Sequence, residues 1–363
     1  MSFTDELKSA VTPRAALLVI GVLALQLLFI ASYVGALHDP KPKDVPFGVV
    51  APGPAAQETS DKLAKLPGEP LDPRVVKDEA AARHKIMNRD IDGALILDPR
   101  GTTDTLLVGS GGGTVLATAL EKIATEVDGA EKRTVKTVDV APASSKDFDG
   151  LSSFYLVVGW CVGGYLCASI LAISAGSRAA NGRRALIRTG VMALYSIAGG
   201  LGGALIIGPI LGALPGSIMG LWGLGALVVF GVGMITLALQ SLTGIVGIGL
   251  AVLLVVIAGN PSAGGAFPLP MLPPFWKEIG PWLPPGAGTW VARSIAYFKG
   301  NAITGPMLVL AAWAVVGTAV TLVMSSLRGD RQPGRQPAMQ ETGTTGTTGT
   351  TGTTGTDSGA HRG

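Results

Sequence analysis

The residue types that usually carry catalysis or bind metals are few in this chain, and their spacing is unsuitable. Cys161 and Cys167 both lie in an apolar run, and six residues apart on a helix they do not share a face. This spacing predicts small buried thiols rather than a disulfide or a metal pair. The histidines, His38, His84 and His361, are scattered and offer no ligand spacing. We therefore expect no metal site.

Motifs for hydrolysis and for nucleotide binding are also missing. The sequence contains no Gly-x-Ser-x-Gly, no His-Glu-x-x-His and no Gly-x-x-x-x-Gly-Lys-Ser/Thr loop. The glycine-rich stretch 109–114 precedes a predicted helix, where phosphate could bind. It has no lysine, however, and its composition favours a flexible turn. We expect no enzyme, no cofactor and no nucleotide hydrolysis by the chain itself.

The placement of charge indicates that lipid surrounds much of the chain. Of 363 residues, 48% are hydrophobic and 15% charged, and no Asp, Glu, Lys or Arg occurs between Arg188 and Lys277. A water-exposed surface of that length without charge would aggregate. The net charge of +3 is small, and no basic stripe is interleaved with aromatic residues, so nucleic acid is excluded as a partner.

Six apolar runs predict transmembrane helices, because each approaches or exceeds the length that crosses a hydrocarbon core of about 30 Å. The fold class is therefore a polytopic α-helical membrane protein with about six spans. The first run, preceded by Lys8 and Arg14, could also be a cleaved signal peptide, but its length favours a retained anchor. The runs cover residues 15–37, 151–175, 189–211, 217–239, 242–258 and 303–327.

Residues 38–150 have the composition of an ordinary water-soluble domain, with 15 Lys and Arg against 19 Asp and Glu. Alternating and buried patterns predict an α+β fold between the first and second spans. The segment 67–73, rich in Pro and Gly, is expected to be a turn. Strands are predicted over 45–50, 93–97, 104–108 and 134–140, and helices over 61–66, 74–88 and 115–127.

Two arginine clusters predict the orientation in the membrane. Arg178, Arg183, Arg184 and Arg188 follow the second span without any acidic residue, and Arg328, Arg331 and Arg335 follow the last. Short segments rich in Lys and Arg stay in the cytoplasm. We therefore expect a multi-pass plasma-membrane protein with residues 38–150 outside and both termini, 1–14 and a disordered tail over 328–363, in the cytoplasm.

The segment 260–300 is too apolar for a free loop and too rich in Pro and Gly to span. It predicts interfacial or re-entrant helices at the outer boundary, with tryptophans at headgroup depth. A membrane-hugging connector remains an equal alternative. The residues expected to form an outer gate or interfacial segment are Pro273, Phe275, Trp276, Trp282, Pro284, Trp290 and Arg293.

This architecture resembles the permease subunits of type 2 ATP-binding-cassette exporters, in the branch with a large outer domain that is similar to phage-infection-protein-like membrane proteins. The resemblance covers 15–327. It depends on one helix, an outer domain and five helices, on 90–97 (Asp-Ile-Asp-Gly-Ala-Leu-Ile-Leu), and on the prolines and Arg293 between Asn260 and the last helix.

The resemblance implies an export permease, energised by a separate ATPase subunit and acting as a homodimer or paired permease. By position, Arg178, Arg183, Arg184 and Arg188 would dock the ATPase, and the re-entrant segment would form the outer gate. The alternative is a non-transporting receptor or scaffold whose outer domain binds a ligand, an envelope component or a phage.

Overall fold

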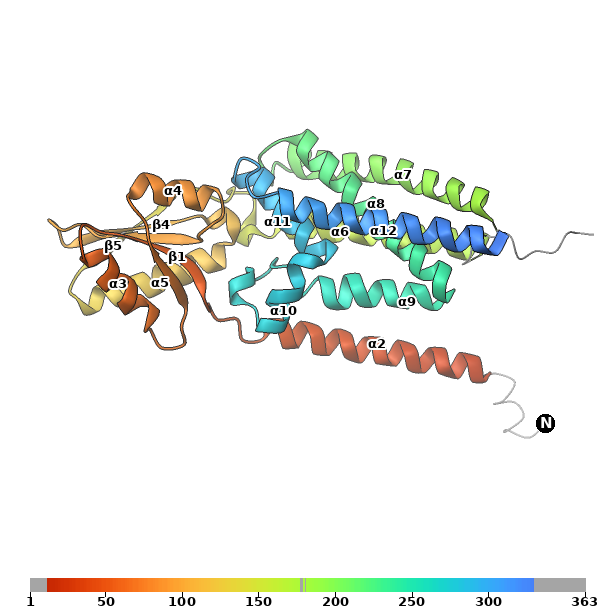
Figure 1. Cartoon of the computed structure of the whole chain (residues 1–363), viewed down its shortest axis with the longest axis horizontal. Helices are drawn as coiled ribbons and strands as arrows, with labels where there is room; N and C mark the ends of the chain where they lie inside the picture. The colour runs from red at the N-terminus through yellow and green to blue at the C-terminus, as the bar shows by residue number, and fades with distance from the viewer. Residues whose placement is uncertain (1–11, 177–178, 180, 330–363) are drawn as a thin grey trace, which may run out of the picture.

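The computed structural model describes residues 12–176, 179 and 181–329. Within them, a sheet domain and a bundle of helices lie end to end along the longest axis (Figure 1). The sheet domain follows the first long helix, α2 (Pro13–Leu37), and precedes α6 (Ser152–Ala175). It therefore occupies the position in the chain where the sequence predicts an inserted domain.

Five strands form one mixed sheet in the order β2-β1-β3-β4-β5. Three of its four pairings are parallel, and only β3 and β4 run antiparallel, with Gly93 opposite Val108. The sheet is thus mainly parallel, since helices connect most of its strands. The strands are β1 (Val45–Val50), β2 (Leu71–Val75), β3 (Gly93–Ile96), β4 (Thr103–Val108) and β5 (Thr134–Asp139).

Helices cover both faces of this sheet, as expected for a mainly parallel one. On one face α3 (Ala55–Ala64) and α5 (Thr114–Ala130) bury Leu63 and Leu120 against Phe47 and Leu106. On the other face α4 (Glu79–Met87) buries Ile86 against Leu107. Because both faces of the sheet are covered, the central strands β1 and β3 consist almost entirely of apolar residues.

The turn predicted over 67–73 is confirmed at its start, but its second half and the start of the helix predicted over 74–88 are wrong, because β2 occupies Leu71–Val75. This strand lies at the sheet edge and pairs only with β1. An edge strand tolerates Pro73, which has no N–H to donate on its free side. The helix begins later, where the Asp78 carboxylate accepts a hydrogen bond from the backbone N–H of Ala81.

Five helices are long and apolar enough to cross a membrane: Ala15–Leu37, Ser152–Ala175, Gly182–Ile210, Ile218–Thr243 and Thr304–Leu327. The third combines α7 (Gly182–Leu205) with a π-helical turn, η3 (Ile206–Ile210), that contains Pro209. The fourth is α8 (Ile218–Thr243) and the last is α12 (Thr304–Gly329). Five apolar helices of this kind indicate a membrane-embedded protein.

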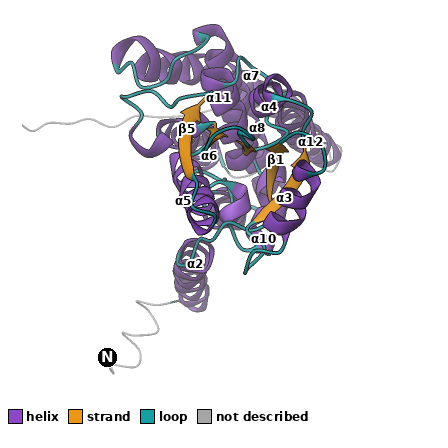
Figure 2. Cartoon of the chain, turned by 90° about the vertical axis from the view of Figure 1, so that its left-hand side faces the viewer, coloured by secondary structure: helices purple, strands orange, loops and turns teal. Residues whose placement is uncertain are grey.

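The helix α8 is the centre of the bundle, because α6, α7 and α12 all pack against it. Its glycines permit this close packing: a Cβ at Gly225 would lie 2.5 Å from the Trp160 ring of α6. By contrast, α2 lies at the margin of the bundle when viewed from the sheet-domain end (Figure 2), where it contacts the π-helix η4 (Leu253–Gly259). Most of its large apolar side chains are exposed, as suits a helix surrounded by lipid.

The fifth predicted span, 242–258, does not form a helix of spanning length. Gly244, with a φ of 71°, ends the helix α8. The helix resumes as α9 (Val246–Val252) and a π-helix, η4 (Leu253–Gly259). Their 14 residues rise about 21 Å, short of a hydrocarbon core of about 30 Å. Apolar composition alone could not reveal this break.

The segment 260–300 folds into short helices, and the last of them packs against the bundle. After a one-turn 3-10 helix, η5 (Leu269–Met271), come α10 (Pro274–Ile279), η6 (Gly280–Trp282) and α11 (Pro284–Tyr297). Pro284 is the first residue of α11, a position that needs no N–H donor. Residues 283–289 are all buried, and α11 contacts α6, α8 and α12.

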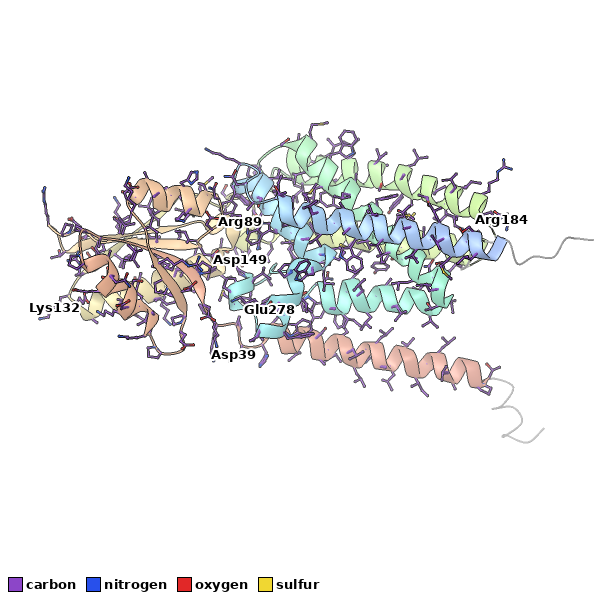
Figure 3. All side chains as sticks on the ribbon, viewed as in Figure 1. Asp39, Arg89, Lys132, Asp149, Arg184 and Glu278 are labelled. Atoms are coloured by element: carbon purple, nitrogen blue, oxygen red, sulfur yellow. The ribbon has the colours of Figure 1, made fainter. Side chains whose placement is uncertain are left out.

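The sheet domain and the arginine-containing start of α7 lie at opposite ends of the molecule (Figure 3). In that view Lys132 marks the far tip of the sheet domain and Arg184 the opposite end of the bundle. The long helices run between these ends (Figure 1). Most of the predicted terminal segments 1–14 and 328–363 lies outside the described residues, which begin at 12 and end at 329.

Candidate functional site

A pocket of about 430 Å³ lies where the sheet domain meets the segment 260–300, and we call it the junction pocket. Its walls come from three parts of the chain: the start of β1 and the α4–β3 loop of the sheet domain, the segment from Ala263 to Arg293, and the start of α12. The charged residues in its lining are Asp44, Arg89, Asp92, Lys277 and Arg293.

Arg89 extends from the sheet domain onto α11. It follows the C-cap residue of α4, Asn88, and its φ of 61° turns the chain away from the helix axis. The guanidinium stacks on the Trp290 ring at 3.4 Å and lies 4.9 Å from the Phe298 ring. Its Nη1 also donates hydrogen bonds to the Trp290 carbonyl, at 2.9 Å, and to the Ser294 hydroxyl, at 3.0 Å.

Arg293 holds the turn before η5 in place from within α11. Its Nη1 donates to the Gly264 carbonyl at 2.7 Å, and its Nη2 donates to the carbonyls of Gly265 and Gly150 at 2.7 and 3.2 Å. The side chain is only 3% exposed, and its Nε has no hydrogen-bond partner. A buried guanidinium bonded only to neutral carbonyls keeps its full positive charge next to the pocket.

Further contacts fix the sheet domain on α11. The Tyr297 hydroxyl donates to the Asp147 carboxylate at 2.5 Å, and the Asn301 amide donates to the Met87 carbonyl at 3.0 Å. The glycine-rich stretch 109–114 packs in this contact, since a Cβ at Gly111 would lie 2.5 Å from the Tyr297 Cβ. It therefore serves as a close-packing surface rather than as an open loop.

None of the five charged residues in the junction pocket takes part in a salt bridge between described residues. Burial raises the pKa of Asp92 to about 6, although the charges of Arg89 and Lys277 oppose the shift. Three cationic and two carboxylate side chains thus line one pocket without pairing closely. Such an arrangement can bind a polar or charged group of a ligand.

An apolar groove, the α12 groove, adjoins the junction pocket. Pro281 and Pro306 line both hollows. The groove is bounded on the α11 side by Trp282, whose carbonyl accepts a 2.8 Å hydrogen bond from the Trp313 indole. Its lining residues are Pro281, Trp282, Gly305, Pro306, Leu308, Val309, Ala312, Trp313 and Val316.

The structure does not bring the residues predicted as an outer gate together at one place. Trp290 and Arg293 lie at the junction pocket, and Pro284 is buried at the start of α11. Phe275 and Trp282 are 63% and 68% exposed. Pro273 caps α10, where the rings of Phe275 and Trp276 meet edge to face. Of the two exposed rings, the indole of Trp282 is of the amphipathic kind that is enriched at membrane interfaces.

The residues predicted to dock an ATPase do not form one exposed loop. Arg183, Arg184 and Arg188 lie on α7, which begins at Gly182, and Arg178 is outside the described residues. Arg183 and Arg184 are exposed. Arg188 is 8% exposed and donates to the carbonyls of Ala175 and Gly176, which it caps at the end of α6. Among the described arginines of this set, Arg183 and Arg184 are therefore accessible to a partner.

Sequence reasoning missed Arg89 and Asp92 as site residues. Both precede the predicted strand at 93–97, and Asp92 falls within the segment 90–97 that carries the family resemblance. The partners of Arg89 on α11 lie 201 and 205 positions away along the chain. The sequence shows only two charged residues just before a buried strand. Charged residues are equally expected there in a loop exposed to solvent, so the pattern did not indicate a site.

Comparison of the chain with family models, with curated proteins and with solved structures gives no match. No group of three or more His, Cys, Asp or Glu residues that could hold a metal occurs in the described part of the chain. The charged junction pocket and the adjoining α12 groove are therefore the candidate functional site.

Proposed function

We propose that this chain is the membrane-spanning permease subunit of an ATP-binding-cassette exporter, energised by a separate ATPase subunit. The observation that carries the proposal is the break at Gly259, where a short apolar helix ends and the chain turns back as α10 and α11. Beside this break lies a charged pocket.

Non-helical backbone at membrane depth is stable only where protein buries it or where it lines a polar cavity, since lipid cannot satisfy its hydrogen bonds. Both conditions describe the segment after Gly259. Arg293 satisfies the carbonyls of Gly264 and Gly265, and the same segment lines the junction pocket. Helices interrupted beside a pocket are typical of transport proteins, where they form substrate sites and gates.

The proposed orientation has the sheet domain outside the cell and both termini in the cytoplasm. Arg183 and Arg184 lie at the end of the bundle opposite the sheet domain. Short segments rich in arginine remain on the cytoplasmic side. In this orientation the junction pocket faces the outer boundary of the membrane, as an outer gate requires.

The chain has no nucleotide-binding loop of its own, so a partner must supply the energy. Arg183 and Arg184 offer two exposed positive charges at the cytoplasmic end for contact with that partner. We expect a homodimer or a paired permease, with each chain contributing one set of helices. Closure of the ATPase subunits would favour one conformation through contacts that differ between the two states.

Affinity purification of the tagged chain from its native membrane in mild detergent tests this proposal. We expect an ATP-binding-cassette ATPase to co-elute and its ATP hydrolysis to fall in the Arg183→Ala/Arg184→Ala variant. Lys132→Ala, which removes a charge at the opposite end of the molecule, is the matched control and should leave hydrolysis unchanged.

A lone dimer without an ATPase, under conditions that preserve known transporter complexes, would contradict the proposal. Specific binding of an envelope component or a phage to residues 38–150 would then support the receptor or scaffold alternative. An ATPase that co-elutes but ignores the double arginine variant would reject the docking surface and leave the exporter standing.

A further inference from the structure

The junction pocket and the α12 groove meet at Pro281 and Pro306, so a charged hollow continues directly into an apolar one. We propose that together they form one binding site for an anionic phospholipid from the leaflet nearest the sheet domain. Its headgroup would occupy the junction pocket and one acyl chain would lie along the α12 groove.

Charge complementarity favours an anionic headgroup. Arg89, Lys277 and Arg293 carry three positive charges against two negative charges on Asp44 and Asp92, which leaves the lining at +1. A phosphodiester with no other charge carries −1 and neutralises that excess. Partly buried charges without a partner are costly, and an anion that supplies hydrogen-bond acceptors relieves that cost.

Donor groups remain available for such a headgroup. Arg89 makes both of its hydrogen bonds through Nη1, and the described residues offer no acceptor to its Nη2 or Nε. Arg293 contributes positive charge rather than a free donor, because its Nη atoms bind carbonyls and its unpartnered Nε is fully buried. The Lys277 ammonium makes no salt bridge with a described residue. An ammonium and two guanidinium groups are well suited to phosphate oxygens.

The dimensions of the groove fit one acyl chain. It follows α12 from Gly305 to Val316, which is about 16 Å at 1.5 Å per residue. That length is roughly half of a hydrocarbon core about 30 Å thick, the depth of one leaflet. Trp282 and Trp290 lie at the polar end of the groove and in the pocket, where tryptophan favours the headgroup boundary.

This inference does not depend on the proposed export activity, because the site would bind lipid whether or not an ATPase partner exists. The two ideas can therefore fail separately. If the chain binds the lipid but has no ATPase partner, the lipid site stands and the proposed export activity fails. If an ATP-driven complex forms but shows no lipid selectivity, only the proposed export activity stands.

The test is native mass spectrometry of the purified full-length chain, released from nanodiscs that contain equal amounts of phosphatidylglycerol and phosphatidylcholine. We expect phosphatidylglycerol to be retained preferentially. In the Lys277→Gln variant that preference should fall about tenfold, as expected for the loss of one charge-assisted hydrogen bond. Lys132→Gln, the same change at the far tip of the sheet domain, should have no effect.

A second variant tests the groove independently of charge. Leu308 is 66% exposed on α12, so Leu308→Trp should fill the groove without disturbing the fold and should reduce retention of both lipids. Size-exclusion chromatography verifies that each variant is folded. Two results would overturn the inference and indicate only annular lipid. One is equal retention of phosphatidylglycerol and phosphatidylcholine by the unmodified chain. The other is a preference for phosphatidylglycerol that is the same in Lys277→Gln as in Lys132→Gln.

Discussion

Replacing Arg89 by Gln should loosen the sheet domain from α11. The change removes a guanidinium stacked on Trp290 and two hydrogen bonds from a charged donor. The stack is worth about 0.5–2 kcal/mol, and each charge-assisted hydrogen bond about 1.5–3 kcal/mol. These contributions overlap, and Gln can keep one bond, so we expect a loss of about 3 kcal/mol.

Thermal unfolding of the purified chain in detergent, followed by circular dichroism at 222 nm, measures this loss. A change of 1 kcal/mol shifts the Tm by roughly 2–4 °C in domains of 150–250 residues, so Arg89→Gln should lower the Tm by about 6 °C or more. The control is Arg83→Gln on the same sheet domain. Arg83 pairs only with Glu79 on the surface of α4, and its loss should cost about 0.5 kcal/mol or less.

A double-mutant cycle with Trp290→Leu isolates the stack, because that variant keeps the backbone carbonyl that Arg89 binds. We expect the two changes to be less than additive by about 0.5–2 kcal/mol. Additivity to within about 0.3 kcal/mol would refute the stabilising stack of Arg89 on Trp290. A Tm for Arg89→Gln equal to that of Arg83→Gln would refute the assignment of Arg89 as a contact that fixes the sheet domain on α11.

Two further predictions concern the sheet domain and α11. Burial, followed by the charge of Asp104, raises the pKa of Asp128 to about 7, so the native state holds this proton more tightly than the unfolded chain and stability falls as the pH rises from about 4 to 7. Asp128→Asn removes this loss and should raise the Tm more at pH 8 than at pH 5; an equal shift at both would contradict the titration. Gly286→Ala should lower the Tm by several degrees, because its Cβ would lie 2.1 Å from the Gly280 carbonyl oxygen. Gly305→Ala is the control: its Cβ would have no atom within 4 Å, so the Tm should stay unchanged or rise. Similar Tm values for the two variants would contradict this packing.

Local patterns in the sequence were sufficient for the long apolar helices and for several strands. The strand predicted over 45–50 is β1, and the first predicted span matches the helix Ala15–Leu37. These elements were predictable because their periodicity and length reflect their own burial or lipid exposure. The apolar helices predicted over 151–175 and 303–327 are likewise confirmed to within one residue at their ends.

Features set by tertiary context were not predictable in the same way. Pro73 indicates a turn, but the free edge of the sheet accepts it in a strand. Val246–Gly259 is as apolar as a span, yet Gly244 and the packing after Gly259 shorten it. The candidate site could be predicted only on the α11 side. Its other side comes from Arg89, whose role depends on a partner far along the chain.

The junction between the sheet domain and α11 also sets the order in which the protein is completed during synthesis. Arg89 binds residues 201 and 205 positions later, and Met87 accepts a hydrogen bond from Asn301, 214 positions later. At roughly 5–20 residues per second, the ribosome makes these partners about 10–40 seconds after Met87 and Arg89. During that interval the sheet domain cannot dock on α11, although it is already connected to α2 and α6. A chain that stalls before α11 therefore displays an open sheet-domain surface, which a protease or chaperone can distinguish from the finished protein.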